Sequence, residues 1–286
     1  MLKYSEANAK LIKLYLVDGL QNWLTDGRFT GEVVSMDLLS GWSCPFAETC
    51  LSKVYEIAGE FTKAGNPKRQ LRDGDKTEHR CFSASQEVIF PAVYDRRKSN
   101  YELLKDCKTV EEMVELLENT LPRNAAIVRQ HVGGDFFNEM YFLAWLKMAE
   151  RNPSILFYAY TKSLNYWVNN MELVNSLPNV VLTASRGGRL DHMIAEHNLR
   201  EAVVVFSEQQ AADMGLEIDH DDSHAALPDL RHQSFALLIH GVQPKGSEAA
   251  KALVELKGKG SYRREKNAIR YPPGEKCNGL PGADPP

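Results

Sequence analysis

The chain has 286 residues, of which 43% are hydrophobic and 25% charged, and its formal net charge is −4. These values are typical of soluble globular proteins, allow one large α/β domain or two small ones, and give no indication of a polyanionic partner. The sequence has neither the roughly 20-residue apolar run of a membrane helix nor the apolar core of a signal peptide. We therefore expect a cytoplasmic protein without a membrane partner, whose five cysteines are not in disulfides.

Residues 1–30 are expected to form an N-terminal helical segment, because apolar residues recur at helical spacing over residues 5–24. The next stretch, GEVVSMDLLSGWSCPFAETC over residues 31–50, begins as an apolar strand and breaks at a Ser-Gly-Trp sequence. It places Cys44 and Cys50 on the loop after the strand, where parallel sheets carry their chemistry. The pattern favours a metal on this loop, in the form of an iron–sulfur cluster, and the alternative is that Cys44 and Cys50 are buried, inert thiols.

An insertion over residues 51–80 is predicted to be helical as far as residue 63 and then to continue as a polar, turn-rich loop. It ends at a third thiol, Cys81, which stands among small and hydroxyl residues before a short apolar helix or turn. Cys107 precedes a helix over residues 109–119 with a capping-box sequence. We expect Cys107 to be a structural thiol, since free cysteine is among the most buried residue types.

Strands and helices alternate through the rest of the chain. The predicted strands cover residues 33–39, 125–134, 155–160, 179–185, 202–208 and 234–241. The strands from 125–134 onward lead into helical segments over 138–152, 164–177, 189–200, 209–217 and 247–260. This alternation implies an α/β fold with a parallel sheet, open or closed into a barrel, whose strands all end on one face. The α/β domain would span residues 31–260, and the Pro- and Gly-rich residues 261–286 would form an extended C-terminal tail.

Polar groups gather directly after these strands. They are His131, Gly133, Gly134 and Asp135 after the second strand, Lys162 after the third, Ser185 and Arg186 after the fourth, and His240 after the sixth. Because this set exceeds what turns require, we expect the face to be a functional site, with His131, Lys162 and His240 as candidates for substrate contact. The alternatives are that Asp135 only caps the following helix and that the glycines only allow a strained turn.

Several sequence segments resemble a known family. CPFAETC, RCFSASQE, HVGGDFF, FYAYTKS, TASRGG and DHDDSHA resemble a protein family of tailed phages and marine viruses called gene product eighty-eight, over about residues 30–260. The resemblance brings no activity with it, but it implies that the cytoplasm is that of the host cell. The layout is also similar to the partial (βα)6 barrel of radical S-adenosylmethionine enzymes, in which a cysteine loop after the first strand holds a [4Fe–4S] cluster by three thiolates.

The second resemblance implies that Cys44, Cys50 and Cys81 bind the cluster and leave one iron free for S-adenosylmethionine. The tight C-x3-C-x2-C spacing of that superfamily is absent here, since five residues separate the first two thiols and thirty separate the second from the third. The insertion must therefore loop back if the three are to converge. Cys277 is a possible fourth ligand, which would close the site.

The same resemblance assigns a cofactor site. Gly133, Gly134 and Asp135 stand where the superfamily has the Gly-Gly-Glu sequence that binds the methionine amino group, with Asp in place of Glu. Ser185 and Arg186 fall where the fourth strand of those enzymes contacts the ribose or carboxylate of the cofactor. The implied protein is a radical-S-adenosylmethionine-like iron–sulfur protein whose substrate the sequence does not name.

Two other kinds of metal site are consistent with the residues. One is a structural zinc in a non-catalytic binding protein, with the ligands Cys44, Cys50, Cys81 and His79. The other is a zinc- or manganese-dependent hydrolase that uses Asp219, His220, Asp221, Asp222 and His224 with His131, Asp135 and His240. The loop over residues 218–225 precedes the sixth strand, so it would have to reach across the sheet to join the rim.

Basic residues could line a groove for nucleic acid or for a phosphorylated, nucleotide-type substrate. They are Lys68, Arg69, Arg72, Arg96, Arg97, Lys98, Lys257, Lys259, Arg263, Arg264 and Lys266, with Tyr94, Tyr101 and Tyr262 near enough for stacking. Most charge runs are solvated faces, so a nucleic-acid partner stays open, and the sequence does not indicate the oligomeric state.

Overall fold

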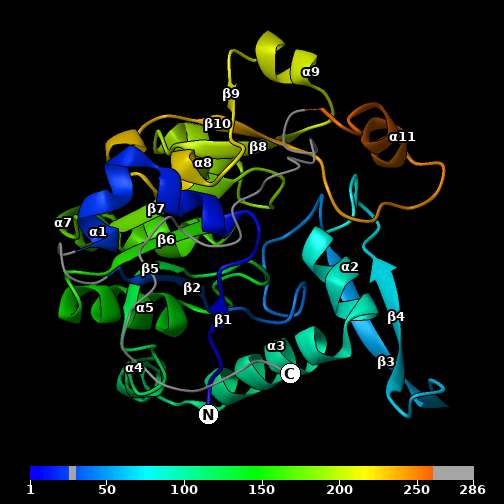
Figure 1. Cartoon of the computed structure of the whole chain (residues 1–286), viewed down its shortest axis with the longest axis horizontal. Coiled ribbons are helices and arrows are strands. Elements are labelled where there is room, and N and C mark those ends of the chain that lie inside the picture. The colour runs from blue at the N-terminus through cyan, green and yellow to red at the C-terminus, as the bar shows by residue number, and fades with distance from the viewer. Residues whose placement is uncertain (26–29, 260–286) are drawn as a thin grey trace, which may run out of the picture.

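A computed structural model describes residues 1–25 and 30–259 of the chain, and its centre is an eight-stranded sheet in the order β1-β2-β5-β6-β7-β8-β10-β9 (Figure 1). The strands are β1 (Ser5–Glu6), β2 (Glu32–Ser35), β5 (Ala125–Arg129), β6 (Leu156–Thr161), β7 (Val180–Ser185), β8 (Glu201–Val205), β9 (Glu217–Ile218) and β10 (Phe235–Leu238). β1 pairs antiparallel with β2, and the other neighbours pair in parallel. The predicted α/β class with a mostly parallel sheet is confirmed.

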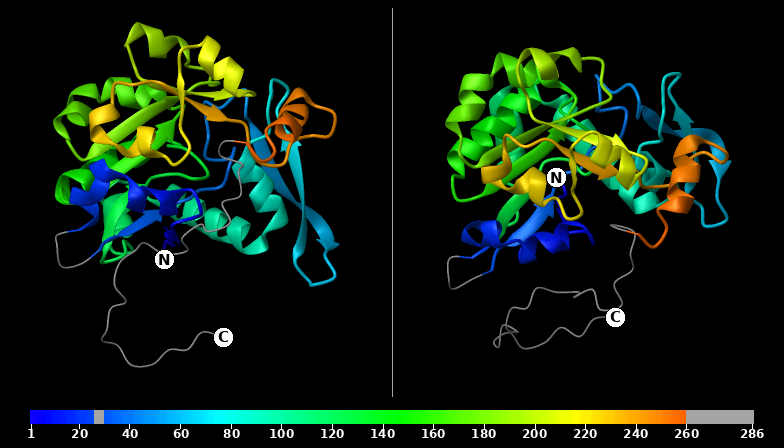
Figure 2. Two further views of the ribbon diagram at one scale, coloured as in Figure 1. Left: turned by 45° about the horizontal axis from the view of Figure 1, so that its top comes forward. Right: turned by 90° about the horizontal axis from the view of Figure 1, so that it is seen from above.

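Helices cover both faces of this sheet (Figures 1 and 2). The α-helices are α1 (Gln21–Leu24), α2 (Phe82–Ile89), α3 (Pro91–Asp106), α4 (Val110–Glu118), α5 (Glu139–Arg151), α6 (Leu164–Asn169), α7 (Met171–Ser176), α8 (His192–Glu196), α9 (Glu208–Asp213), α10 (Ser223–Ala226) and α11 (Glu248–Glu255). On one face, Trp145 of α5 packs in a cluster with Phe157 and Leu182 of the sheet. On the other face, the N-terminal segment and α10 pack against Ile127 and Tyr158. Because parallel strands are covered on both sides, their sequences are nearly continuous apolar runs.

The N-terminal segment is not the single helix that was predicted over residues 5–24. It consists of two 3-10 helices, η1 (Leu11–Leu16) and η2 (Asp18–Leu20), followed by the four-residue α1. Leu11, Leu14, Val17 and Leu20 recur every three residues. That spacing matches the period of a 3-10 helix, so these turns place the leucines on the sheet, where they are fully buried.

The insertion is a β-hairpin, and the helix predicted over residues 51–63 is wrong. β3 (Ser52–Phe61) pairs antiparallel with β4 (Pro67–Asp73), and the hairpin projects from the body of the molecule beside α2 (Figure 2). At its base, Ser52 and Val54 are buried and alternate with more exposed neighbours, which is the period of a strand. The short helix or turn expected after Cys81 is α2, and it leads into the sixteen-residue α3.

Part of the predicted C-terminal region lies outside the described residues. This holds for the tail over residues 261–286 with Cys277, for the last residue of the helix predicted over 247–260, and for the basic residues from Arg263 onward. Among the described residues, no helix combines the length and apolar character needed to cross a bilayer.

The packing of α5 on the sheet predicts that Trp145→Ala strongly destabilises the protein. The side chain is fully buried, so its loss leaves a cavity and should lower the free energy of unfolding by about 3–5 kcal/mol. Val254→Ala on α11 is the control, because Val254 is 75% exposed and should change stability by less than about 0.5 kcal/mol. Urea denaturation measures both, and equal effects would contradict the described core.

Candidate metal and cofactor site

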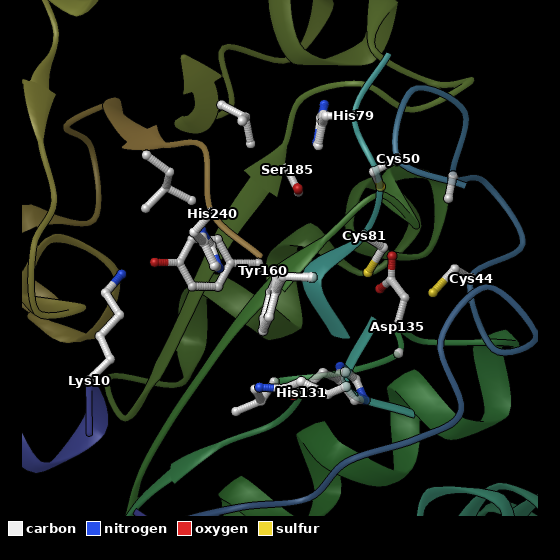
Figure 3. Close-up of a pocket in the computed structure, with 18 of the residues that line it drawn as sticks. Lys10, Cys44, Cys50, His79, Cys81, His131, Asp135, Tyr160, Ser185 and His240 are labelled. Atoms are coloured by element: carbon white, nitrogen blue, oxygen red, sulfur yellow. The ribbon is translucent and has the colours of Figure 1, made fainter. Parts of the chain in front are cut away.

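A cavity of about 450 Å³ lies at the carboxyl ends of the parallel strands. Most residues that the sequence proposed for the site line it: Cys44, Cys50, Cys81, His131, Gly133, Gly134, Asp135, Lys162, Ser185 and His240 (Figure 3). Arg186 does not line the cavity. Its exposed guanidinium instead binds the carboxylate of Glu201 at 2.5 and 2.8 Å.

The three thiols come from two segments that the hairpin brings together. Cys44 and Cys50 lie on the loop after β2, and Cys81 directly precedes α2. At the base of the hairpin, the backbone N–H of Cys81 donates to Oγ of Ser52 at 3.2 Å, and this hydroxyl donates to Asp73 at 2.8 Å. Figure 3 shows the sulfurs of Cys44 and Cys81 directed toward the carboxylate of Asp135. Segments thirty residues apart therefore meet at one end of the cavity.

The cysteine loop is also held by the loop after β7. The backbone N–H groups of Glu48 and Thr49 both donate to the carbonyl of Gly187, at 3.2 and 3.0 Å. Gly187 follows β7 and has a φ of +98°, and a Cβ there would collide with the Thr49 hydroxyl. Gly187 therefore receives the cysteine loop, a role that the sequence did not reveal.

Burial favours the protonated form of two of the three thiols, Cys44 and Cys81. Burial raises the pKa of Cys44 well above its ordinary value, and the nearby Asp135, Cys81 and Cys50 raise it further. Burial and the neighbouring Cys50 likewise raise the pKa of Cys81 to about 11. A bound metal would therefore release protons from these thiols, because thiolate is the ligand form.

The described residues do not surround a single metal ion. Among them, no group of three or more His, Cys, Asp or Glu side chains is arranged to hold one ion. The zinc set of Cys44, Cys50, Cys81 and His79 therefore shares the cavity without forming a tetrahedral site.

Asp135 and Lys162 connect the ends of neighbouring strands. Asp135 accepts hydrogen bonds from the Thr161 hydroxyl at 2.6 Å and from the backbone N–H of Lys162 at 2.8 Å, and burial raises its pKa to about 6. Nζ of Lys162 donates to the carbonyl and hydroxyl of Ser185 and to the carbonyl of Arg186, each at 2.8 Å. The alternative that Asp135 caps α5 is wrong, because Asn138 is the cap.

The imidazoles that line the cavity favour the neutral state. Burial lowers the pKa of His131 to about 3, and its Nε2 lies 3.2 Å from the Tyr141 hydroxyl. Burial also lowers the pKa of His240 and of His79 to about 4. The ring of His240 contacts Phe82, with 4.4 Å between centroids. Neutral imidazoles are proton acceptors and metal ligands rather than binding sites for anions.

The loop over residues 218–225 reaches the cavity, where its carboxylates form ion pairs. Asp222 binds Lys10 at 2.6 Å and Arg129 at 2.5 Å, and Asp219 binds Lys10 at 3.0 Å. Although burial favours the neutral acid, Arg129 and Lys10 hold the pKa of Asp222 well below its ordinary value. His224 contacts Asp219 and Glu217. In this arrangement Asp219 and Asp222, two of the acidic residues proposed for a hydrolytic metal, compensate Lys10 and Arg129.

The basic residues expected to form a groove are divided among separate contacts. Lys68 pairs with Glu60, Lys98 pairs with Glu56, and Arg97 is buried against Glu87. The guanidinium of Arg69 lies over the ring of Tyr94. These contacts compensate several of the charges that a nucleic acid would need.

The close contact between Gly187 and Thr49 predicts that a side chain at residue 187 is destabilising. A second glycine with a positive φ, Gly215, serves as the control for backbone strain. Gly187→Ala should lower the free energy of unfolding by about 1–3 kcal/mol more than Gly215→Ala, because the new methyl group overpacks against Thr49. Gly215 also has a positive φ, +67°, but nothing lies within 4 Å of its missing Cβ. Chemical denaturation measures both variants, and equal losses would show that the cysteine loop is not held there.

The buried imidazoles predict a loss of stability in acid. His131 has an ordinary pKa of 6.5 and a folded pKa of about 3, so the unfolded chain binds more protons between these values. Its contribution is present above pH 6.5 and falls as the pH decreases, by up to about 1.4 kcal/mol per pH unit. His131→Phe should therefore flatten the fall in unfolding free energy between pH 6.5 and 4. Parallel profiles for the variant and the wild type would contradict this assignment.

Comparison with known proteins places the chain in a family. Residues 2–257 match the family model described as Gene product 88. The chain is 32% identical over 90 residues to the Gene 88 protein of Mycobacterium phage L5, an alignment that covers 29% of this chain and 38% of that protein. No solved structure matches. The family match covers nearly the whole chain, which confirms the phage-family part of the sequence prediction: the protein belongs to the Gene product 88 family.

Proposed function

We propose that the protein is an iron–sulfur protein that binds a [4Fe–4S] cluster on Cys44, Cys50 and Cys81, with S-adenosylmethionine beside it. The observation that carries the proposal is the convergence of three thiols, from two separate segments, on one cavity at the carboxyl ends of parallel strands.

The strand order supports the partial-barrel layout on which this proposal draws. In a doubly wound sheet the strand order reverses at a switch point, where ligands bind. Here β2, β5, β6, β7, β8 and β10 are neighbours in chain order, as successive strands are in a barrel. The cysteine loop follows the first of these strands and the Gly-Gly-Asp sequence follows the second, which is the order that the radical-S-adenosylmethionine resemblance implies.

The donor set fits a cluster better than a single ion. Thiolates that hold a four-iron cluster bind separate irons, so their sulfurs need not surround one point. This agrees with thiols that share one cavity, where Cys50 lies close enough to raise the pKa of Cys44 and of Cys81, without forming a single-ion site among the described residues. Three protein thiolates would leave one iron open to the cavity. When bound, the cluster and S-adenosylmethionine would supply one-electron chemistry, which the protein side chains cannot.

The residues beside the thiols fit the amino-acid end of the cofactor. Asp135 places its carboxylate next to Cys44 and Cys81, where it can attract an ammonium group (Figure 3). The shorter Asp in place of Glu is held by Thr161 and Lys162, which fix its position at the end of β6. Gly133 and Gly134 line the same cavity, and the N–H of Gly133 donates to a carboxylate oxygen of Asp37 at 3.4 Å. Ser185 lies at the same end, bound to Lys162.

Metal analysis of the full chain purified without oxygen tests the proposal. The expected result is a brown protein with absorbance near about 400 nm and about four iron and four sulfide per chain. Cys44→Ala, Cys50→Ala and Cys81→Ala should each lose most of the iron, because each removes a cluster ligand. Cys107→Ala is the matched control, since Cys107 lies outside the cavity lining, and it should keep the iron.

Two results would overturn the proposal. One is a triple variant at Cys44, Cys50 and Cys81 that retains full iron. The other is a wild-type protein that contains zinc alone in stoichiometric amount, which would indicate the structural-zinc alternative.

A further inference from the structure

Arg97 is a buried cation in the middle of α3, and it contacts several segments at the cavity. Its side chain is nearly inaccessible, with 3% of the residue exposed. Nη1 donates to Oε1 of Glu87 at 3.1 Å and to the carbonyl of Ser83 at 3.0 Å, and Nη2 donates to Gln86 at 3.2 Å. These three partners belong to α2, the helix that begins directly after Cys81.

Glu87 also binds the segment that leads to Cys44. The same Oε1 atom accepts hydrogen bonds from the backbone N–H of Ser40 at 3.0 Å and from its hydroxyl at 2.7 Å. Ser40 precedes Gly41, whose N–H donates to the sulfur of Cys44 at 3.4 Å. One carboxylate oxygen on the helix after Cys81 therefore fixes the start of the loop that carries Cys44.

The guanidinium of Arg97 also lies against the glycine segment. A Cβ on Gly133 would be 2.8 Å from Cζ and 3.0 Å from Nε of Arg97. Only a residue without a side chain lets these groups approach so closely. Arg97 thus contacts the glycine segment directly, the Cys81 helix directly, and the Cys44 loop through Glu87.

A buried ion pair contributes little net stability compared with an apolar pair of similar volume, because both charges lose their hydration. Its directional hydrogen bonds, however, fix the relative positions of the groups that it joins. We propose that the Glu87/Arg97 pair is a positioning device that holds the Cys44 loop, the Cys81 helix and Gly133 in register before any metal binds. That a cluster binds to the positioned thiols rests on the proposed function. The positioning role itself can be measured on the metal-free protein.

The test compares two buried arginines in the full chain. Arg97→Met removes the pair, and Arg200→Met is the matched control. Arg200 is also buried and donates to four backbone carbonyls, but it lies outside the cavity lining. Iodoacetamide alkylation of the metal-free protein, followed peptide by peptide, gives the rate at each thiol, with Cys107 as the internal reference.

The proposal predicts that Arg97→Met raises the alkylation rates of Cys44 and Cys81 relative to Cys107 by about tenfold, which corresponds to about 1.4 kcal/mol of local opening. Arg200→Met should leave the ratio unchanged. Glu87→Gln keeps the side-chain shape and an acceptor oxygen, so it should shift the ratio in the same direction by less, and it serves if Arg97→Met does not fold. Equal changes at all three thiols, or the same change in Arg200→Met, would overturn the positioning role.

Iron content separates this inference from the proposed function. After anaerobic reconstitution, the wild type and Arg200→Met should hold iron and sulfide, and Arg97→Met should hold less. A wild type without iron whose Cys44 and Cys81 still become reactive in Arg97→Met would refute the cluster and keep the positioning role. An Arg97→Met protein with wild-type iron and unchanged thiol reactivity would refute the positioning role alone.

Discussion

The candidate site depends on the hydrogen bonds at the base of the hairpin. Oγ of Ser52 accepts from the backbone of Cys81 and donates to Asp73, and Arg80 binds the same carboxylate through Nε and Nη2. Ser52 and Asp73 are also the first paired residues of β3 and β4. This junction brings together the two ends of residues 51–80. Cys50 and Cys81, which flank this segment, therefore become neighbours. Beside the junction, the backbone N–H groups of Glu78 and His79 donate to the carbonyl of Thr49, at 2.8 and 3.2 Å, which also holds the segment before Cys81 next to Cys50.

The remaining walls of the cavity follow from contacts between strand-exit loops. The loop after β2 is held by the loop after β7 through Gly187, and Asp135 and Lys162 tie the ends of β5, β6 and β7 together. In the view of Figure 3, Lys10 lies on the side away from the cysteines, where Asp219 and Asp222 compensate it. The cavity therefore has a sulfur-rich end and an end whose buried charges are paired. The proposed cluster would lie at the first end.

The sequence predicted the parts of the fold that depend on apolar periodicity. Six strands of the sheet, β2, β5, β6, β7, β8 and β10, were identified because each is a short apolar run between turn signals, whereas the two-residue β9 was not predicted. The glycine segment and the other polar residues after the strands were expected at one face because parallel strands end there. That Cys81 joins Cys44 and Cys50 was expected only from the radical-S-adenosylmethionine resemblance. The N-terminal segment was assigned the wrong helix type, since leucines spaced by three residues also fit part of a helical face.

Other features could not be predicted from the sequence, because buried polar residues form them and leave no apolar periodicity. The buried residues of α3 are Tyr94, Arg97, Asn100 and Leu104, so half of its inward face is polar and has no apolar periodicity. Asn100 is buried because it bonds the backbone of Lys3 and Asp37. The hairpin was missed because only its base packs against the body, and the role of Gly187 depends on a loop from a distant strand. Pairings of this kind arise from tertiary contacts, which local sequence does not encode.

The central claim is that Cys44, Cys50 and Cys81 hold iron at the sulfur-rich end of the cavity. The most direct test is a crystal structure of the anaerobically purified full chain, with diffraction data collected at the iron absorption edge. The account predicts an anomalous peak bounded by the three sulfurs and facing Asp135. An iron-containing protein whose peak lies elsewhere, or a structure in which the sulfur of Cys81 points away from the other two, would contradict it.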